Sequence, residues 1–160
     1  MVRVPVLAFA TVLAGSLPAF AGEPPRPEDV KAVQTCLGTD KPTADRRRCI
    51  GIVADRCLEQ EGGDTTAGMT ACYDRENLAW DSLLNRFYGG LQKSFDEPGR
   101  RYLKEVQAGW IRFRDDSCQW PEHVFEGGSL AGPLAVECLR DATAERTLTL
   151  MQMDESQNPR

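Results

Sequence analysis

Residues 107–118 read Gln-Ala-Gly-Trp-Ile-Arg-Phe-Arg-Asp-Asp-Ser-Cys, and this stretch decides the predicted fold. Large side chains in and just before it recur at offsets of three and four, which places them on one face of a helix. The stripe contains Leu103, Val106, Trp110 and Phe113, with Gln107 and Arg114 along its edge. Polar side chains beside a core need partners, because an unpaired buried charge is expensive. The stretch therefore predicts a packed central helix with a polar insert; the alternative places Gln107 and Arg114 at the solvent boundary.

Residues 1–21 have the pattern of a secretory signal peptide. Arg3 supplies the positive start, a short apolar run follows, and Ala19-Phe20-Ala21 has small residues at the two positions that signal peptidase reads. We expect cleavage between Ala21 and Gly22. The mature chain, residues 22–160, should form a single helical domain that is periplasmic or secreted, without stable membrane insertion.

The six cysteines all follow the predicted cleavage site, as is typical of disulfide-bonded exported domains. The chain has no Cys-x-x-Cys motif and one histidine, so we expect neither a metal site nor another cofactor. Each disulfide should span an expected turn between helices, and should stabilise the fold by roughly 3 kcal/mol if unstrained. The predicted pairs are Cys36–Cys49, Cys57–Cys72 and Cys118–Cys138.

The charge of the mature chain bears on its partners. Removal of residues 1–21 takes away Arg3, which leaves 18 basic against 24 acidic residues and a net charge of −6. Such a chain has no electrostatic attraction for nucleic acid or anionic lipid, whereas it would be attracted to a basic protein.

Five helical segments are predicted, separated by breaks rich in glycine and proline. They cover residues 28–37, about 45–60, about 66–95, about 98–118 and about 134–153. Thr65 or Thr66 should cap the third helix, and Pro98 suits the first turn of the fourth. No strand pattern or repeat is present. The predicted fold class is all-α, a disulfide-stapled bundle of about five helices.

The segment from Gln119 to Pro133 interrupts the helical pattern with two prolines and three glycines. At about 15 residues, it is longer than most connections in compact domains, which makes it a candidate for function. Cysteines bracket it, and it mixes aromatic with polar side chains. We expect a partner-binding loop that uses Trp120, His123, Phe125, Glu126 and Ser129.

Polar residues also line the inner edges of three predicted helices. They are Asp81, Asn85 and Tyr88 on the third, Gln107 and Arg114 on the fourth, and Arg146 within the apolar stripe of the fifth. We expect a partly buried network in which Asp81 meets one or both of these arginines. Its expected role is to set the register of the helices, and ligand binding is the alternative. Arg140 lies off that apolar stripe, so its replacement should cost less than that of Arg146.

Catalytic patterns are absent from the sequence. His123 has no neighbouring nucleophile, Gly128-Ser129 lacks the flanking glycine of a nucleophile elbow, and no glycine-rich loop precedes a basic residue. The chain is therefore predicted not to be an enzyme.

Together these residues resemble the LprI-type lysozyme inhibitor domain family, whose members are small exported helical domains, many of unknown function. The resemblance covers about Cys57 to Leu150. It rests on a Trp-Asp-x-x-Leu-Asn-x-x-Tyr motif at 80–88, Gln-x-x-Trp at 107–110, Arg-Asp-x-x-Cys at 114–118, Gly-Gly-Ser at 127–129 and Thr-x-x-Arg at 143–146, with Cys57, Cys72 and Cys138. Residues 28–50, with their own cysteine pair, lie outside it.

Two functions are compatible with these observations. The first, implied by the resemblance, is an exported inhibitor of lysozyme or a related cell-wall hydrolase. Its partner would be a basic lysozyme-like enzyme, steered to the acidic chain and blocked by the 119–133 segment. The second is an envelope interaction or stress protein of the same fold without lysozyme-inhibitor activity. A lysozyme lysis assay separates the two.

Overall fold

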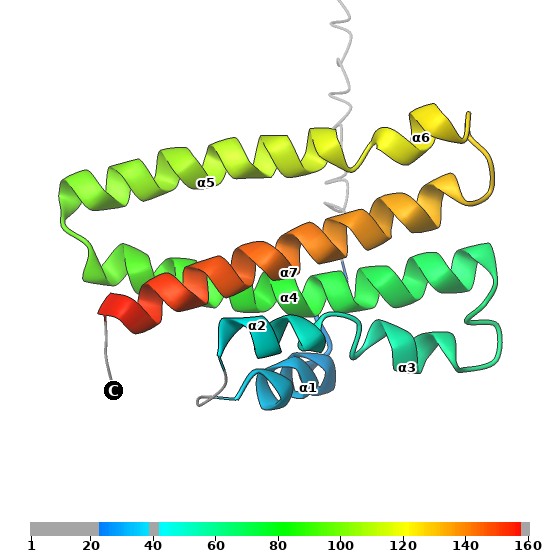
Figure 1. The fold of residues 1–160 in the computed structure, drawn as a ribbon, viewed down its shortest axis with the longest axis horizontal. Helices are drawn as coiled ribbons and strands as arrows, with labels where there is room; N and C mark the ends of the chain where they lie inside the picture. The colour runs from blue at the N-terminus through cyan, green and yellow to red at the C-terminus, as the bar shows by residue number, and fades with distance from the viewer. Residues whose placement is uncertain (1–22, 39–41, 158–160) are drawn as a thin grey trace, which may run out of the picture.

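The computed structural model describes residues 23–38 and 42–157, and within them it contains helices and no strand (Figure 1). The all-α, disulfide-stapled bundle is confirmed. The predicted signal peptide and its cleavage point lie outside the described residues. The elements are α1 (Pro27–Leu37), α2 (Thr43–Arg46), the 3-10 turn η1 (Arg47–Cys49), α3 (Ala54–Leu58), α4 (Thr66–Ser94), α5 (Glu97–Ser117), α6 (Trp120–Val124) and α7 (Ala131–Gln157).

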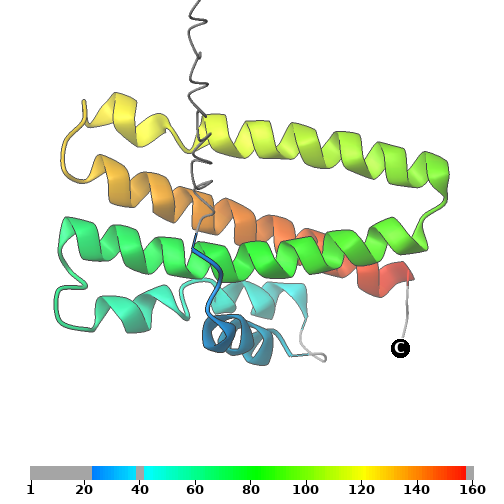
Figure 2. The same ribbon diagram turned by 180° about the vertical axis from the view of Figure 1, so that it is seen from behind.

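The two longest helices, α4 and α7, lie side by side along most of their length and form the centre of the molecule (Figures 1 and 2). Trp80, Leu83 and Leu91 of α4 are fully buried there. Ala79 and Ala144 are also buried, and such small side chains let the helix backbones approach. The hydroxyl of Thr147 donates to the Trp80 carbonyl at 3.2 Å, which ties the two helices together at their middle.

The remaining helices cover this pair from two sides. The short elements α1, η1 and α3 pack on one side, and α5 runs antiparallel to α4 on the other (Figure 2). Thr65, one of the two residues predicted for this role, caps α4 by accepting from the Gly68 amide at 3.0 Å. Asp96 caps α5 in the same way, accepting from the Gly99 amide at 2.9 Å, and Pro98 lies in its first turn.

All three predicted disulfides are confirmed. Cys36–Cys49 links α1 to η1, Cys57–Cys72 links α3 to α4, and Cys118–Cys138 links the end of α5 to α7. Within the described residues no cysteine is free. The short elements α1, η1 and α3 and the end of α5 are thus attached covalently to neighbours in the bundle.

The second predicted helix, about 45–60, is wrong as a continuous element. The chain instead forms α2, η1 and α3, with a turn between the last two. Gly51 has φ +101° in this turn, a conformation that side chains disfavour. An added Cβ there would also come within 2.9 Å of Asp55 Oδ2. The turn leaves backbone N–H groups without helical partners, and these need acceptors from elsewhere.

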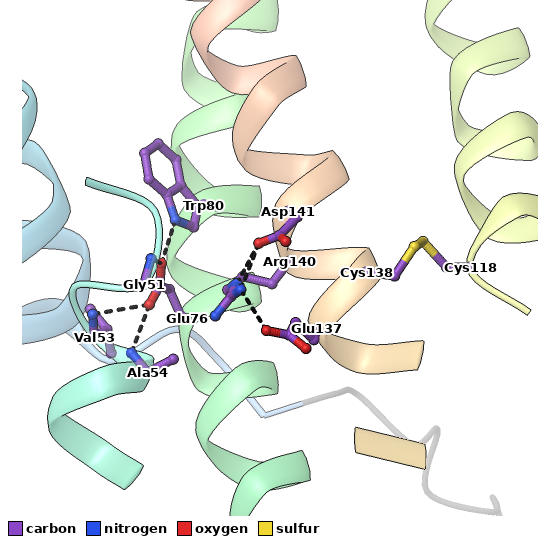
Figure 3. A network of polar contacts seen from close by, with 10 residues as sticks. All are labelled: Gly51, Val53, Ala54, Glu76, Trp80, Cys118, Glu137, Cys138, Arg140 and Asp141. Atoms are coloured by element: carbon purple, nitrogen blue, oxygen red, sulfur yellow. Dashed lines mark hydrogen bonds and ion pairs between the residues drawn. A yellow bond between two sulfur atoms is a disulfide. The ribbon is translucent and has the colours of Figure 1, made fainter. Parts of the chain in front are cut away.

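Glu76 of α4 is that acceptor (Figure 3). Its side chain is fully buried, and its two oxygens accept from the amides of Gly51 at 2.7 Å, Val53 at 3.0 Å and Ala54 at 2.7 Å. A fourth donor, Trp80 Nε1, lies 2.9 Å from Oε1. Four N–H donors can compensate a buried carboxylate without a cationic partner. The arrangement attaches the turn before α3 to the centre of the bundle.

Replacing Glu76 should therefore destabilise the protein strongly. Glu76→Leu leaves three buried amides without acceptors, and we expect a loss of at least about 3 kcal/mol in the free energy of unfolding. Glu76→Gln keeps the volume but turns an NH₂ group toward N–H donors, and should cost about 2 kcal/mol. Urea denaturation with the disulfides intact measures both, and the exposed Glu59→Gln is the matched control. A Glu76→Leu variant as stable as the control would contradict this role.

Candidate functional site

The inward face of α5 differs from the predicted stripe. Leu103 is buried and Trp110 partly so, but Phe113 is 70% exposed and Val106 is 37% exposed. Gln107, expected at the edge, is only 6% exposed. The helix is turned so that its polar edge faces α7. The prediction failed here because apolar periodicity cannot register that a polar residue has a partner on another helix.

That partner is Arg146 of α7. Its Nε donates to Gln107 Oε1 at 2.9 Å, and its guanidinium lies 5.8 Å from the centre of the Trp110 ring. Burial lowers the pKa of Arg146 from its ordinary value, because desolvation disfavours the charged form. Its Nη2 atom is buried without a hydrogen-bond partner. Arg146 and Gln107 thus join α7 to α5, and the register-setting role of this contact stays a prediction.

The other predicted members are connected differently from what was expected. Within the described residues, no ion pair joins Asp81 to Arg114 or Arg146, so that part of the network was wrong. Arg114 instead pairs with its neighbour Asp115, at 2.7 Å, and donates to the Thr143 hydroxyl at 3.3 Å. Asp81 accepts from Asn85 Nδ2 at 2.8 Å, one turn away on the same helix.

These side chains border an open cleft of about 290 Å³ between α4 and α5. Five of the six predicted network residues line it, and Arg146 is the exception. The α4 wall consists of Asp81, Leu84, Asn85 and Tyr88, and the α5 wall of Lys104, Gln107, Ala108, Trp110, Ile111 and Arg114. Apolar side chains with a few polar groups are the usual lining of a ligand pocket, and this volume is near the lower end of the usual range. The lining and volume of this cleft are therefore compatible with the ligand-binding role that was the alternative for the network.

Arg140 is more deeply buried than its place off the predicted stripe indicates. It is 6% exposed and forms ion pairs with Glu137 at 3.3 Å and Asp141 at 2.7 Å (Figure 3). Its guanidinium also stacks over the Tyr73 ring. The expectation that its replacement is much milder than that of Arg146 rested on exposure and has lost its basis. An arginine can be buried by partners on and beside its own helix, and the apolar pattern does not reveal this.

The segment from Gln119 to Pro133 is shorter as a loop than predicted. Residues 120–124 form α6, and α7 begins at Ala131, so within this segment only Gln119 and residues 125–130 are without helix. All five proposed binding residues are exposed, at the end of the molecule where α5 meets α7 (Figure 1). Trp120 and Phe125 contact each other, with ring centroids 6.1 Å apart. The Cys118–Cys138 bond holds the base, so the segment forms a short, anchored tip.

A second groove, of about 380 Å³, lies beside this tip. Trp120 forms one side, and α7 supplies Glu137, Asp141 and Glu145 at helical spacing on the other. Arg140 and Arg47 pair with these carboxylates, and only partly balance them. An exposed aromatic residue next to acidic side chains is a surface that a basic protein can bind.

In the part of the chain that the structure describes, no group of three or more His, Cys, Asp or Glu side chains is placed to hold a metal ion. Nor is any helix in that part of the chain both long and apolar enough to cross a membrane.

Comparison with known proteins identifies the family of this chain. The family model described as lysozyme inhibitor LprI matches residues 57–150. The chain belongs to the LprI lysozyme inhibitor family. A protein of Rhizobium meliloti (strain 1021), described as uncharacterized, is 30% identical over 101 residues, which cover 55% of this chain and 73% of that protein. No solved structure matches the chain.

The LprI match includes α4, α5, α6 and most of α7, and with them both the cleft and the tip. It leaves out α1, α2, η1 and the Cys36–Cys49 bond. Glu76, which lies inside the match, is the residue that sequence reasoning missed. A signal was present: Glu76 precedes Trp80 by four residues and so lies on the buried stripe of its helix, where a carboxylate must have partners.

The Arg146–Gln107 contact can be tested by a double-mutant cycle. Arg146→Met leaves the Gln107 oxygen without its donor, and Gln107→Leu leaves Arg146 Nε without its acceptor. Because both orphaned groups disappear in the double variant, it should lose about 1 kcal/mol less stability than the sum of the single variants. Urea denaturation of the four proteins measures this coupling.

Arg140→Met with Gln107→Leu is the matched control cycle, since Arg140 has other partners. These two changes should add within about 0.5 kcal/mol. Equal coupling in both cycles would show that the Arg146–Gln107 contact has no specific energetic role.

Proposed function

We propose that the protein is an exported inhibitor that binds a basic, lysozyme-like cell-wall hydrolase. The observation that carries the proposal is the match to the LprI lysozyme inhibitor family over residues 57–150. Three disulfides and the signal-peptide pattern of residues 1–21 support export, because disulfides persist in oxidising compartments. Cleavage between Ala21 and Gly22 then leaves the acidic mature domain.

The binding surface that we propose is the tip formed by α6 and residues 125–130. Trp120 and Phe125 supply apolar area, and His123, Glu126 and Ser129 supply hydrogen-bonding groups around it. Glu126 has φ +48° and is followed by Gly127 at φ +75°, so the chain reverses sharply at the end of the tip. A narrow tip of this kind suits the cleft of a glycan-cleaving enzyme, where two carboxylates flank the scissile bond.

Anchoring at both ends should favour binding by the tip. The disulfide at its base and the Trp120–Phe125 contact reduce the conformational freedom that docking would remove. The groove beside Trp120, with Glu137, Asp141 and Glu145, extends the acidic surface toward α7. A basic enzyme would then be attracted over a wider area than the tip itself.

Truncation of the polar tip residues should weaken inhibition. His123→Ala combined with Ser129→Ala removes exposed hydrogen-bonding groups, and we expect at least a tenfold loss of affinity, about 1.4 kcal/mol, for a basic lysozyme. The melting temperature should stay nearly unchanged, because neither residue is buried. Surface plasmon resonance and a lysis assay measure affinity and inhibition.

Lys93→Ala combined with Gln152→Ala is the matched control, since both residues are exposed and lie near the ends of α4 and α7, away from the tip. A double tip variant that binds as tightly as the wild type would move the binding surface elsewhere. Wild-type protein that inhibits no lysozyme at micromolar excess would favour the second function, an envelope interaction or stress protein without inhibitor activity.

Association with the hydrolase should depend on salt. If acidic side chains steer the encounter, raising ionic strength from 0.05 to 0.5 M should lower the association rate by about tenfold and change the dissociation rate little. Glu126→Gln should lower the association rate at low salt and flatten its salt dependence, whereas the distant Glu59→Gln should not. Stopped-flow fluorescence measures these rates, and a salt-independent rate would rule out steering.

A further inference from the structure

The cleft between α4 and α5 contains two opposite charges that no ion pair satisfies. Asp81 on α4 accepts from Asn85, and neither it nor Lys104 on α5 forms an ion pair within the described residues. The third charge in the cleft, Arg114, is balanced by Asp115 at 2.7 Å. The charges without an ion-pair partner are therefore the carboxylate of Asp81 on one wall and the ammonium of Lys104 on the other.

These two charges lie at different ends of the cleft. The helices are antiparallel, and Gln92 Nε2 donates to the Arg100 carbonyl at 3.2 Å. One turn further along both helices, Lys104 comes opposite Tyr88. Asp81 lies seven residues before Tyr88, which at 1.5 Å per residue is about 10 Å along the helix. An extended peptide of three residues spans about the same distance.

The cleft also offers two hydrogen-bond donor groups and one acceptor that are still available. Arg146 occupies the Gln107 oxygen, which leaves the Nε2 donors of Gln107 without an acceptor among the described residues. Asn85 donates to Asp81, which leaves its Oδ1 as an acceptor. Tyr88 accepts from Gln92 at 3.0 Å, and its own O–H can still donate. A peptide group needs one donor and one acceptor of this kind, and a carboxylate needs donors.

We propose that this cleft binds a short peptide with free ends, about three residues long. Its ammonium group lies against Asp81, and its carboxylate against Lys104 and the Tyr88 hydroxyl. Its backbone C=O accepts from Gln107, and a backbone N–H donates to Asn85. Leu84, Ala108 and Ile111 provide apolar surface between these polar positions. This function is independent of hydrolase inhibition, because the cleft and the tip use different residues.

The charge pattern favours a zwitterion over other ligands of this size. A phosphate ester would meet Asp81 as a like charge, and a fatty acid would leave Asp81 unsatisfied. A neutral oligosaccharide would leave both charges without a partner. A peptide with both ends free is the ligand class that satisfies the carboxylate, the ammonium and the two amides together.

Titration of the isotope-labelled protein, with disulfides intact, tests the proposal by NMR. The probe is tri-L-alanine, and we expect saturable shifts in the side-chain amide signals of Asn85 and Gln107, with a Kd of about millimolar order. N-acetyl-tri-alanine and tri-alanine amide each lack one terminal charge. Each should bind about fivefold more weakly than tri-alanine, as expected for the loss of a solvent-accessible ion pair.

Two variants assign the ends of the peptide. Asp81→Asn should weaken tri-alanine binding about fivefold. N-acetylation of the peptide should then have no further effect on its affinity for this variant, whereas C-terminal amidation should still lower that affinity. Lys104→Gln should show the reverse pattern. Asp116→Asn and Lys93→Gln, both exposed and outside the cleft, are the matched controls and should bind like the wild type. Melting curves for all variants establish that they are folded.

Three results would overturn the proposal. The first is the absence of saturable shifts with tri-alanine, and the second is shifts confined to residues outside the cleft. The third is equal binding of the free and the end-blocked peptides. Shifts at Asn85 and Gln107 with chitotriose but not with tri-alanine would identify the cleft as a glycan site instead. No hydrolase is present in these experiments, so their outcome is separate from that of the inhibition assays.

Discussion

The structure depends first on the buried carboxylate of Glu76. It compensates three amides of the turn before α3 and the indole N–H of Trp80, and thereby attaches the N-terminal layer to α4. The backbone carbonyl of Trp80 in turn accepts from Thr147 of α7. One turn of α4 thus connects three parts of the bundle. Because each donor would be costly to bury without an acceptor, these contacts specify a single arrangement of the short helices as well as stabilising it.

The second constraint is the way α5 meets the central pair. Only Leu103 and Gln107 of this helix are buried. It contacts α7 through the Arg146–Gln107 and Arg114–Thr143 hydrogen bonds, through Arg146 over Trp110, and through the Cys118–Cys138 bond at its end. A helix held mainly by polar contacts and one disulfide need not close fully on its neighbours. The cleft toward α4 follows from this, and its walls carry the polar residues that an apolar interface would have excluded.

The family motif is therefore divided between two physical roles. Gln107, Trp110 and Arg146 hold α5 in place, and Asp81, Asn85 and Tyr88 line the cleft. The exposed tip at α6 forms a separate surface, anchored by a disulfide and close to the carboxylates of α7. A small stapled bundle can present two such surfaces because the covalent bonds and the buried Glu76 stabilise it independently of either one.

Much of this was determined by the sequence alone. Helical periodicity and turn residues located α1, α4, α5 and most of α7, and they narrowed the cap of α4 to Thr65 or Thr66, of which Thr65 is the cap. The even cysteine count with intervening turns predicted all three disulfides. These features are local: each depends on residues close in the chain, or on a covalent bond across one turn. The motif residues likewise indicated the family before the comparison established it.

Only the tertiary structure decided the features that depend on partners far apart in sequence. The helix break at Gly51 could not be predicted locally, because the acceptor for its backbone N–H is Glu76, which lies 25 residues away in the sequence. The face of α5 that turns inward was set by Arg146, 39 residues from Gln107, and so Phe113 is exposed where periodicity had placed it in the core. The physical reason is the same in each case: a polar group can be buried wherever another segment satisfies it, and the hydrophobic pattern of one helix carries no information about that segment.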